Sequence, residues 1–128
     1  DHLYRSGTTA MLGITQLGSR QGRKQFVTVF NLASDGTVQL LYPLAGDGEG
    51  ALPDSGNLPV LEAEVVPPYG VDHVVAVTTP DFPFELRGAL RAAEGQRAAG
   101  RFVGPIRLAL ARARGKGSLS ITELYSAR

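Results

Sequence analysis

The chain of 128 residues contains no cysteine and no tryptophan, and it has a single methionine. Without cysteine it can form no disulfide bond, hold no thiolate-bound metal ion and offer no thiol nucleophile. This absence leaves the cellular compartment open, because exported bacterial proteins often do without disulfides. With 43% hydrophobic and 20% charged residues, the composition is that of a globular domain rather than a disordered segment.

Long hydrophobic runs are also missing. No apolar run approaches the roughly 20 residues that cross a bilayer, so no transmembrane segment is expected. The first residues, DHLYRSGTTAML, have neither an initiator methionine nor the layout of a signal peptide. We therefore expect residues 1–128 to form a single domain, excised from a larger protein.

Basic residues are absent from a long central stretch, although the net charge of the whole chain is only +1. Between Val27 and Phe84 there is no lysine or arginine, and all the charged residues other than histidine are acidic: Asp35, Asp47, Glu49, Asp54, Glu62, Glu64, Asp72 and Asp81. From Glu85 to Lys116 the balance reverses, and arginines dominate. This segregation predicts two surfaces of opposite sign, suited to the recognition of charged partners.

Strand patterns dominate the chain up to Pro80. The clearest is QFVTVFNLASDGTVQLLYP, in which two β-branched and aromatic runs flank a tight turn at Ser34–Gly36. Both faces of the first run are apolar, with Phe30 on one and Val29 on the other, which predicts a central hairpin covered on both sides. LPVLEAEVVPP alternates as a half-solvated strand, GVDHVVAVTTP follows as another, and SLSITELYSA closes the chain as a strand.

Two short segments have turn chemistry. In the hairpin turn, Asp35 precedes Gly36, which can take a positive φ without steric cost. In the corner PPYG, we expect Pro68 and Tyr69 to fix the entry into the next strand, and Gly70 to adopt a conformation that other residues resist. These five residues are interpreted as structural.

Helical patterns appear late. Asp81 is expected to cap a helix whose first turn carries Pro83 and whose apolar stripe is Leu86, Ala89, Leu90 and Ala93. Pro105 is expected to open a second helix that ends at Gly115. The order predicts an α+β, mainly β fold: an antiparallel β-sandwich-like sheet with two late helices packed on it before a closing strand.

The pair Asp72–His73 is the first candidate for catalysis. Neighbouring side chains on a strand point to opposite faces, so this aspartate is poorly placed to orient this imidazole. No serine lies in a Gly-x-Ser-x-Gly elbow, and no other nucleophile stands out. We therefore interpret the pair as the start of a strand, and retain as an alternative a small hydrolase that uses His73 with a nucleophile not evident from the sequence.

Carboxylates offer two further candidates. Asp47, Glu49 and Asp54 lie in a loop rich in glycine, where an irregular cation site is possible, but the EF-hand spacing fails at Ala51. The paired Glu62 and Glu64 fit a solvated strand face better than glycosidase chemistry, which needs two carboxyls across a cleft. We predict no catalytic residue, no metal site and no cofactor.

Arginines form the more distinctive group. Arg87 and Arg91 lie one turn apart on the first expected helix, and Arg107 and Arg114 lie two turns apart on the second. Such helices suit an anion or a nucleic acid, although few aromatic residues lie among them and the chain is barely basic. We favour a protein partner contacted by these four arginines and by Glu62 and Glu64, with the anion- or nucleic-acid-binding module as the alternative.

One family resemblance rests on two motifs. VFNLASDGTVQLLYP has an apolar strand, an Asp-Gly turn, a second strand and a terminal proline, and VVPPYGVDHVVAVTTPDF has a proline–aromatic–glycine corner before an apolar strand. In both, the segment Phe26–Phe82 resembles the bacterial family named domain of unknown function 4384. The long loop AGDGEGALPDSGN and the many arginines depart from that family.

The resemblance implies an accessory module. Domains of that family are appended to larger bacterial proteins, often beside caspase-like peptidases or protein kinases and often in exported or envelope proteins. The family has no assigned catalytic residues to carry over. The resemblance and the missing set of catalytic residues together predict a non-catalytic protein-interaction domain of a larger bacterial protein. The resemblance alone implies a location in the periplasm, in the cell envelope or outside the cell.

Overall fold

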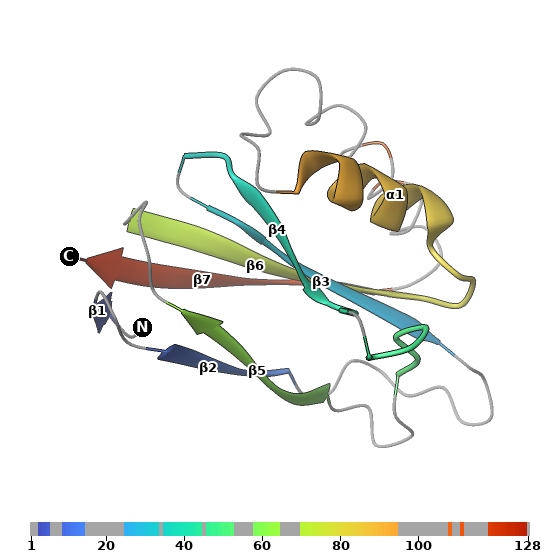
Figure 1. The fold of residues 1–128 in the computed structure, drawn as a ribbon, viewed down its shortest axis with the longest axis horizontal. Helices are drawn as coiled ribbons and strands as arrows, with labels where there is room; N and C mark the ends of the chain where they lie inside the picture. Colours follow the sequence, from blue (N-terminus) through green and yellow to red (C-terminus); the bar gives the residue numbers. More distant parts are fainter. Residues whose placement is uncertain are drawn as a thin grey trace.

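A computed structural model describes residues 3–5, 9–14, 25–33, 35–44, 46–52, 58–64, 70–94, 108, 111 and 118–127. Within these ranges the elements are seven strands and one helix (Figure 1). In chain order they are β1 (Leu3–Arg5), β2 (Thr9–Ile14), β3 (Phe26–Leu32), β4 (Val38–Tyr42), β5 (Leu58–Glu64), β6 (Gly70–Thr79), α1 (Phe84–Ala93) and β7 (Ser118–Ala127). The chain is therefore α+β and mainly β, as the sequence predicts.

The strands form two sheets. The larger has the order β1-β7-β6-β3-β4, and the smaller pairs β2 with β5. All neighbouring strands are antiparallel except β1, which runs parallel to β7. In Figure 1 the β2–β5 pair lies on the opposite side of the larger sheet from α1.

The hairpin of β3 and β4 forms where the sequence predicts it. Gly36 has φ of +88°, and its N–H donates to the carbonyl of Ala33 at 2.9 Å. The Asp35 carboxylate accepts the N–H of Thr37 at 2.9 Å, so the side chain closes the turn that the sequence assigns to it. The hairpin is not central as a pair, however: β3 lies between β6 and β4, and β4 is the edge strand.

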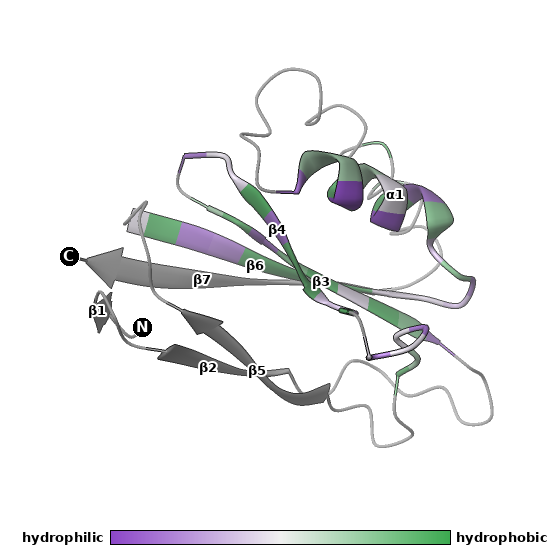
Figure 2. Cartoon of the chain, in the orientation of Figure 1, coloured by the Kyte–Doolittle hydropathy of each residue, from purple (hydrophilic) through white to green (hydrophobic). Residues whose placement is uncertain are grey.

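Buried side chains lie on both faces of β3. Phe30 joins one cluster with Val75, Val77 and the helix, whereas Val27 and Val29 join a second cluster with Leu41, Tyr42, Val74 and Ala76. Figure 2 shows hydrophobic residues along β3 and β4 and in parts of β6. The expectation that β3 is covered on both sides is confirmed, and this burial is the main stabilising term of the sheet.

Helix α1 covers the first of these faces. Leu86, Leu90 and Ala93 follow the i, i+4, i+7 spacing and are buried against the sheet. The expected cap was wrong: the helix begins at Phe84 with Pro83 at its N-cap, and no side chain caps it. A proline keeps the preceding residue out of the helical region, so the helix cannot begin before Pro83.

Two expectations fall partly outside the described residues. Of the second expected helix, only Leu108 and Ala111 are described, each in helical conformation. Pro68 and Tyr69 of the corner lie outside the described residues, whereas Gly70 begins β6 with φ of +136°, a conformation that favours glycine.

Candidate functional site

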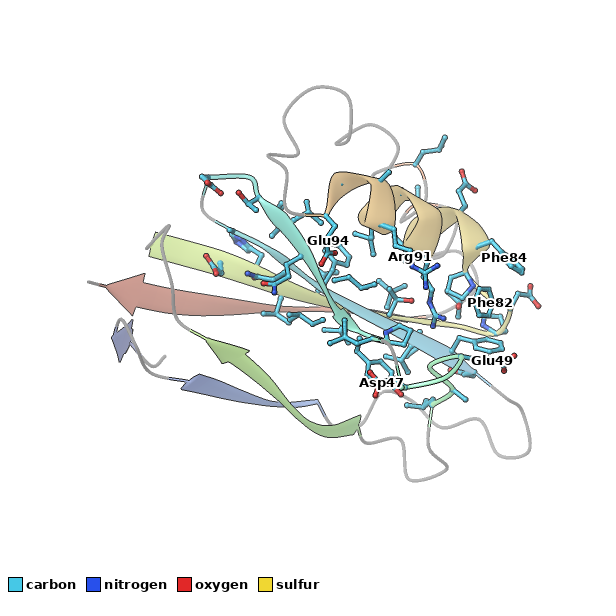
Figure 3. The ribbon with its side chains drawn as sticks, viewed as in Figure 1. Asp47, Glu49, Phe82, Phe84, Arg91 and Glu94 are labelled. Carbon is cyan, nitrogen blue, oxygen red and sulfur yellow. The ribbon has the colours of Figure 1, made fainter. Side chains whose placement is uncertain are left out.

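An open groove lies between α1, the edge strand β4 and the loop that follows it. Its volume is about 530 Å³, and it is lined by Leu40, Pro43, Leu44, Gly46, Gly48, Arg91 and Glu94. Leu40 and Pro43 are buried, so they supply an apolar floor. Figure 3 shows Arg91 and Glu94 projecting from α1 towards β4 and the loop that carries Asp47 and Glu49.

The loop wall is held in place by Asp47. Its carboxylate accepts the N–H of Leu44 at 2.7 Å, and its own N–H donates to the Leu44 carbonyl at 3.0 Å. This reciprocal pair closes a tight turn in which Gly46 has φ of +97°. Asp47 therefore acts within the loop, and the side chain of Leu44 remains 52% exposed at the rim of the groove.

Glu94 closes the other end of the groove. It lies at the C-terminal cap of α1, and its Oε2 accepts the N–H of Leu40 at 2.9 Å. An isolated parallel bridge joins Glu94 to Val38. A backbone donor on the edge strand is thus satisfied by a side chain rather than by another strand.

Arg91 is the exposed cation of the groove. It lies one turn before Glu94 on the same side of α1. Within the described part of the chain, no hydrogen bond or ion pair involves its guanidinium, although Arg91 lowers the pKa of the neighbouring Arg87. The sequence analysis places Arg91 on a partner-binding surface, and its exposure is compatible with that role.

Arg87 requires a correction. The sequence analysis groups it with Arg91 on an exposed basic surface, but Arg87 is only 2% exposed. Its Nε donates to Thr28 Oγ1 at 3.1 Å, its Nη1 to the Glu49 carbonyl at 2.6 Å, and its Nη2 to the Val27 carbonyl at 3.0 Å. The planar guanidinium can satisfy donors in three directions at once, so it joins α1 to β3 and to the loop.

Burial of Arg87 has an electrostatic cost. Desolvation lowers the pKa of its guanidinium, Arg91 lowers it further, and Tyr42 and Glu49 oppose these effects. The Phe82 ring lies 4.7 Å from the guanidinium carbon and adds a cation–π contact. Gly50 also approaches closely: a Cβ there would lie 2.7 Å from Arg87 Nη2.

Aromatic residues gather beside Arg87. The ring centroids of Phe82 and Phe26 lie 5.4 Å apart in an edge-to-face arrangement. Those of Phe82 and Phe84 lie 4.4 Å apart, with the rings tilted. Phe84 is nevertheless 77% exposed. It lies two turns before Arg91 on the same side of α1, so an apolar ring and a cation follow one another along the helix (Figure 3).

The candidate pair Asp72–His73 lies near the start of β6, away from this groove. The Asp72 carboxylate accepts a hydrogen bond from Asn31 Nδ2 at 3.0 Å, across to β3. His73 is half-buried and stands opposite Leu32 in the strand register. Because the two residues are adjacent on a strand, their side chains point to opposite faces, as the sequence indicates.

The remaining candidates lie in β5 or outside the described residues. Glu62 and Glu64 lie in β5, opposite Met11 and Thr9. Arg107, Arg114 and Asp54 lie outside the described residues. Among those that are described, no three histidine, aspartate or glutamate residues are grouped as metal ligands, and no helix is long and apolar enough to cross a membrane.

Sequence reasoning missed four residues of the site: Leu44, Gly50, Phe84 and Glu94. Phe84 had a visible signal, because it falls outside the apolar stripe of its own helix. Gly50 and Glu94 had none, since each acts through contacts more than 35 residues away in the chain, with Arg87 and Leu40 respectively.

Comparison with known proteins identifies no relative. No protein-family model matches this chain, and neither a curated protein nor a solved structure matches it.

Proposed function

We propose that this chain is a non-catalytic accessory domain that binds a protein partner through the groove between α1, β4 and the loop 43–50. The observation that carries the proposal is the composition of that groove: an apolar floor, an exposed Arg91 without a described partner, and an exposed leucine at its rim. Concave apolar sites with a few polar groups are the usual form of a binding site.

Exposed apolar side chains at this place support a macromolecular partner. Leu44 and Phe84 are among the large hydrophobic residues that remain exposed in the described part of the chain. Leu44 lines the groove, and Phe84 lies farther along the same side of α1 as Arg91. Aromatic residues and arginine are enriched at the centres of protein interfaces, where they supply much of the binding energy.

Two carboxylates that suggested catalysis or a cation site accept hydrogen bonds within the chain. Asp72 accepts a hydrogen bond from Asn31, and Asp47 closes its own loop. These contacts favour a binding role over the hydrolase alternative. Arg87 supports the groove from below rather than lining it, because its donors are committed to Thr28 and to two backbone carbonyls.

The finer architecture and the family belong to the same proposal. We propose that the β2–β5 pair packs over Val27, Val29 and Val74 to give a sandwich-like fold, and that residues 105–114 form a second helix. We further propose that the domain belongs to the domain of unknown function 4384 family and is carried by a larger exported bacterial protein. The hairpin turn and the corner glycine, both with positive φ, support this resemblance.

Site-specific photo-cross-linking tests the function. A benzophenone amino acid is placed at Leu44, at the rim of the groove, or at Ala92, which is exposed on the solvent side of α1. We expect irradiation of the cells that make this protein to give a discrete protein adduct from position 44 and none from position 92. Equal adducts at both positions, or none at either, would contradict the proposal. His73→Ala should leave the adduct unchanged.

A further inference from the structure

The start of α1 carries an exposed aromatic ring. Phe84 is the first residue of the helix and is 77% exposed, and its ring centroid lies 4.4 Å from that of Phe82. Phe82 is half-buried and contacts Phe26 in turn. Figure 3 shows Phe82 and Phe84 together at this end of α1, with Glu94 at the opposite end. The three rings thus contact one another in series, and Phe84 is the most exposed of them.

The same aromatic cluster already holds one cation inside the protein. The guanidinium carbon of Arg87 lies 4.7 Å from the centroid of the Phe82 ring, and Arg87 is buried. The quadrupole of an aromatic ring attracts a cation to its face, and arginine makes this contact more often than lysine does. Phe84 presents the same kind of ring to solvent, and among the described residues no cation contacts it.

Acidic residues flank the exposed ring in the chain. Within residues 79–90 the charged residues are Asp81, Glu85 and Arg87. Asp81 and Glu85 are exposed, one on each side of Phe84 in the sequence, whereas Arg87 is buried. The formal charge that this segment presents to solvent is therefore negative, and it complements a cation.

The positive charges nearby do not cancel this effect. The guanidinium of Arg87 donates to two backbone carbonyls, and the charge of Glu49 acts on it. Glu85, in the first turn, offsets the positive end of the α1 dipole. Among the described residues, no hydrogen bond or ion pair involves the carboxylate of Asp81.

We propose that Asp81, Phe84 and Glu85 bind an arginine side chain of the protein partner, whose guanidinium stacks on the Phe84 ring and pairs with the flanking carboxylates. The inference rests on the proposed function, since it names the chemistry of one contact on that partner. Arginine fits better than lysine, because a planar guanidinium stacks on a ring while its N–H groups donate to carboxylates. Phe84 and Arg91 lie on the same side of α1, so this contact can belong to one interface with the groove.

NMR titration with defined tripeptides tests this inference. The probes are Gly-Arg-Gly with both ends capped, the same peptide with citrulline, which is neutral and has nearly the same shape, and the same peptide with lysine. We expect the arginine peptide to bind the complete 128-residue chain about fivefold or more tightly than the citrulline peptide. The lysine peptide should bind more weakly than the arginine peptide, and the amide resonances of Phe84 and Glu85 should shift on binding.

Substitutions on this surface should remove the preference. Phe84→Leu keeps an apolar side chain without a ring and should lower the preference for arginine over citrulline about threefold, whereas Phe84→Tyr should retain it. Asp81→Asn and Glu85→Gln should each weaken the arginine peptide about twofold and leave the citrulline peptide unchanged. Ala92→Lys, which changes net charge by the same amount on the solvent side of α1, should have little effect.

Other outcomes contradict the inference. Equal affinities for the arginine and citrulline peptides would mean that the surface does not recognise charge, and equal affinities for arginine and lysine would remove the stacked guanidinium. A preference that survives Phe84→Leu in full would place the binding elsewhere on the chain. If cross-linking at Leu44 captures a protein while the peptides show no preference, the proposed function stands and only the arginine contact is lost. The reverse result would contradict the proposed function and support this contact.

Discussion

Replacing Gly50 by alanine tests whether the buried arginine supports the groove. Gly50 has φ of +72°, and an alanine Cβ would lie 2.7 Å from Arg87 Nη2, 3.0 Å from Pro43 Cγ and 3.1 Å from the Val27 carbonyl oxygen. Arg87 is buried and bonded in three directions, so it cannot swing away without breaking a hydrogen bond. The substitution therefore adds a steric effect to a backbone effect.

The magnitude follows from those two effects. A left-handed backbone costs an L-residue about 1 kcal/mol or somewhat more. Displacing Arg87 from the Val27 carbonyl leaves a buried acceptor unsatisfied, which costs a further 1–3 kcal/mol, roughly. We expect Gly50→Ala to lower the free energy of unfolding by about 2–4 kcal/mol in total.

Gly48→Ala is the matched control. Gly48 also has a positive φ, of +65°, but an added Cβ would meet nothing within 4 Å. Gly48→Ala should lower the free energy of unfolding only by the backbone strain, about 1 kcal/mol. Urea denaturation of both variants gives the difference directly, and equal losses at the two glycines would refute the close packing of Gly50 against Arg87.

Three further predictions concern the same framework. Arg87→Met should lower the free energy of unfolding by about 2–4 kcal/mol, because buried carbonyls lose their donors, and denaturant titration that gives less than 1 kcal/mol would contradict this. Gly36→Val should cost about 1 kcal/mol or more from its positive φ, and thermal melts equal to the parent would refute the turn. Burial and, to a lesser extent, Asp47 raise the pKa of Tyr42 above its ordinary value of 10.0, and Arg87 opposes this effect. The free energy of unfolding should therefore fall as pH rises from the pKa of the unfolded chain through that of the folded chain. Tyr42→Phe should remove the contribution of Tyr42 to this loss in alkaline denaturation curves.

Local chemistry explains why much of the fold could be predicted. The Asp35–Gly36 turn, β6 and the stripe of Leu86, Leu90 and Ala93 each depend on neighbouring residues, whose spacing is visible in the sequence. The start of α1 was misplaced because Asp81 is a good capping residue, whereas Pro83 decides where the helix begins.

The groove was not predicted, because it depends on contacts between distant segments. Helical spacing alone does not reveal that Arg87 turns inward to Thr28 while Arg91, one turn later, stays exposed. Nor does it show that Glu94 reaches the edge of β4, since that contact spans 54 positions of the chain. Charge segregation predicted a binding surface, and the arrangement of α1 against β4 forms the groove that we propose for it.

The central claim is that the groove beside Arg91 binds a protein. The most direct measurement is calorimetric titration of the partner captured at Leu44 against the parent chain, Arg91→Gln and Ala92→Glu, which alter net charge equally on the groove side and the solvent side of α1. We expect Arg91→Gln to weaken binding about fivefold or more, with Ala92→Glu close to the parent. Equal affinities for all three chains would contradict the account.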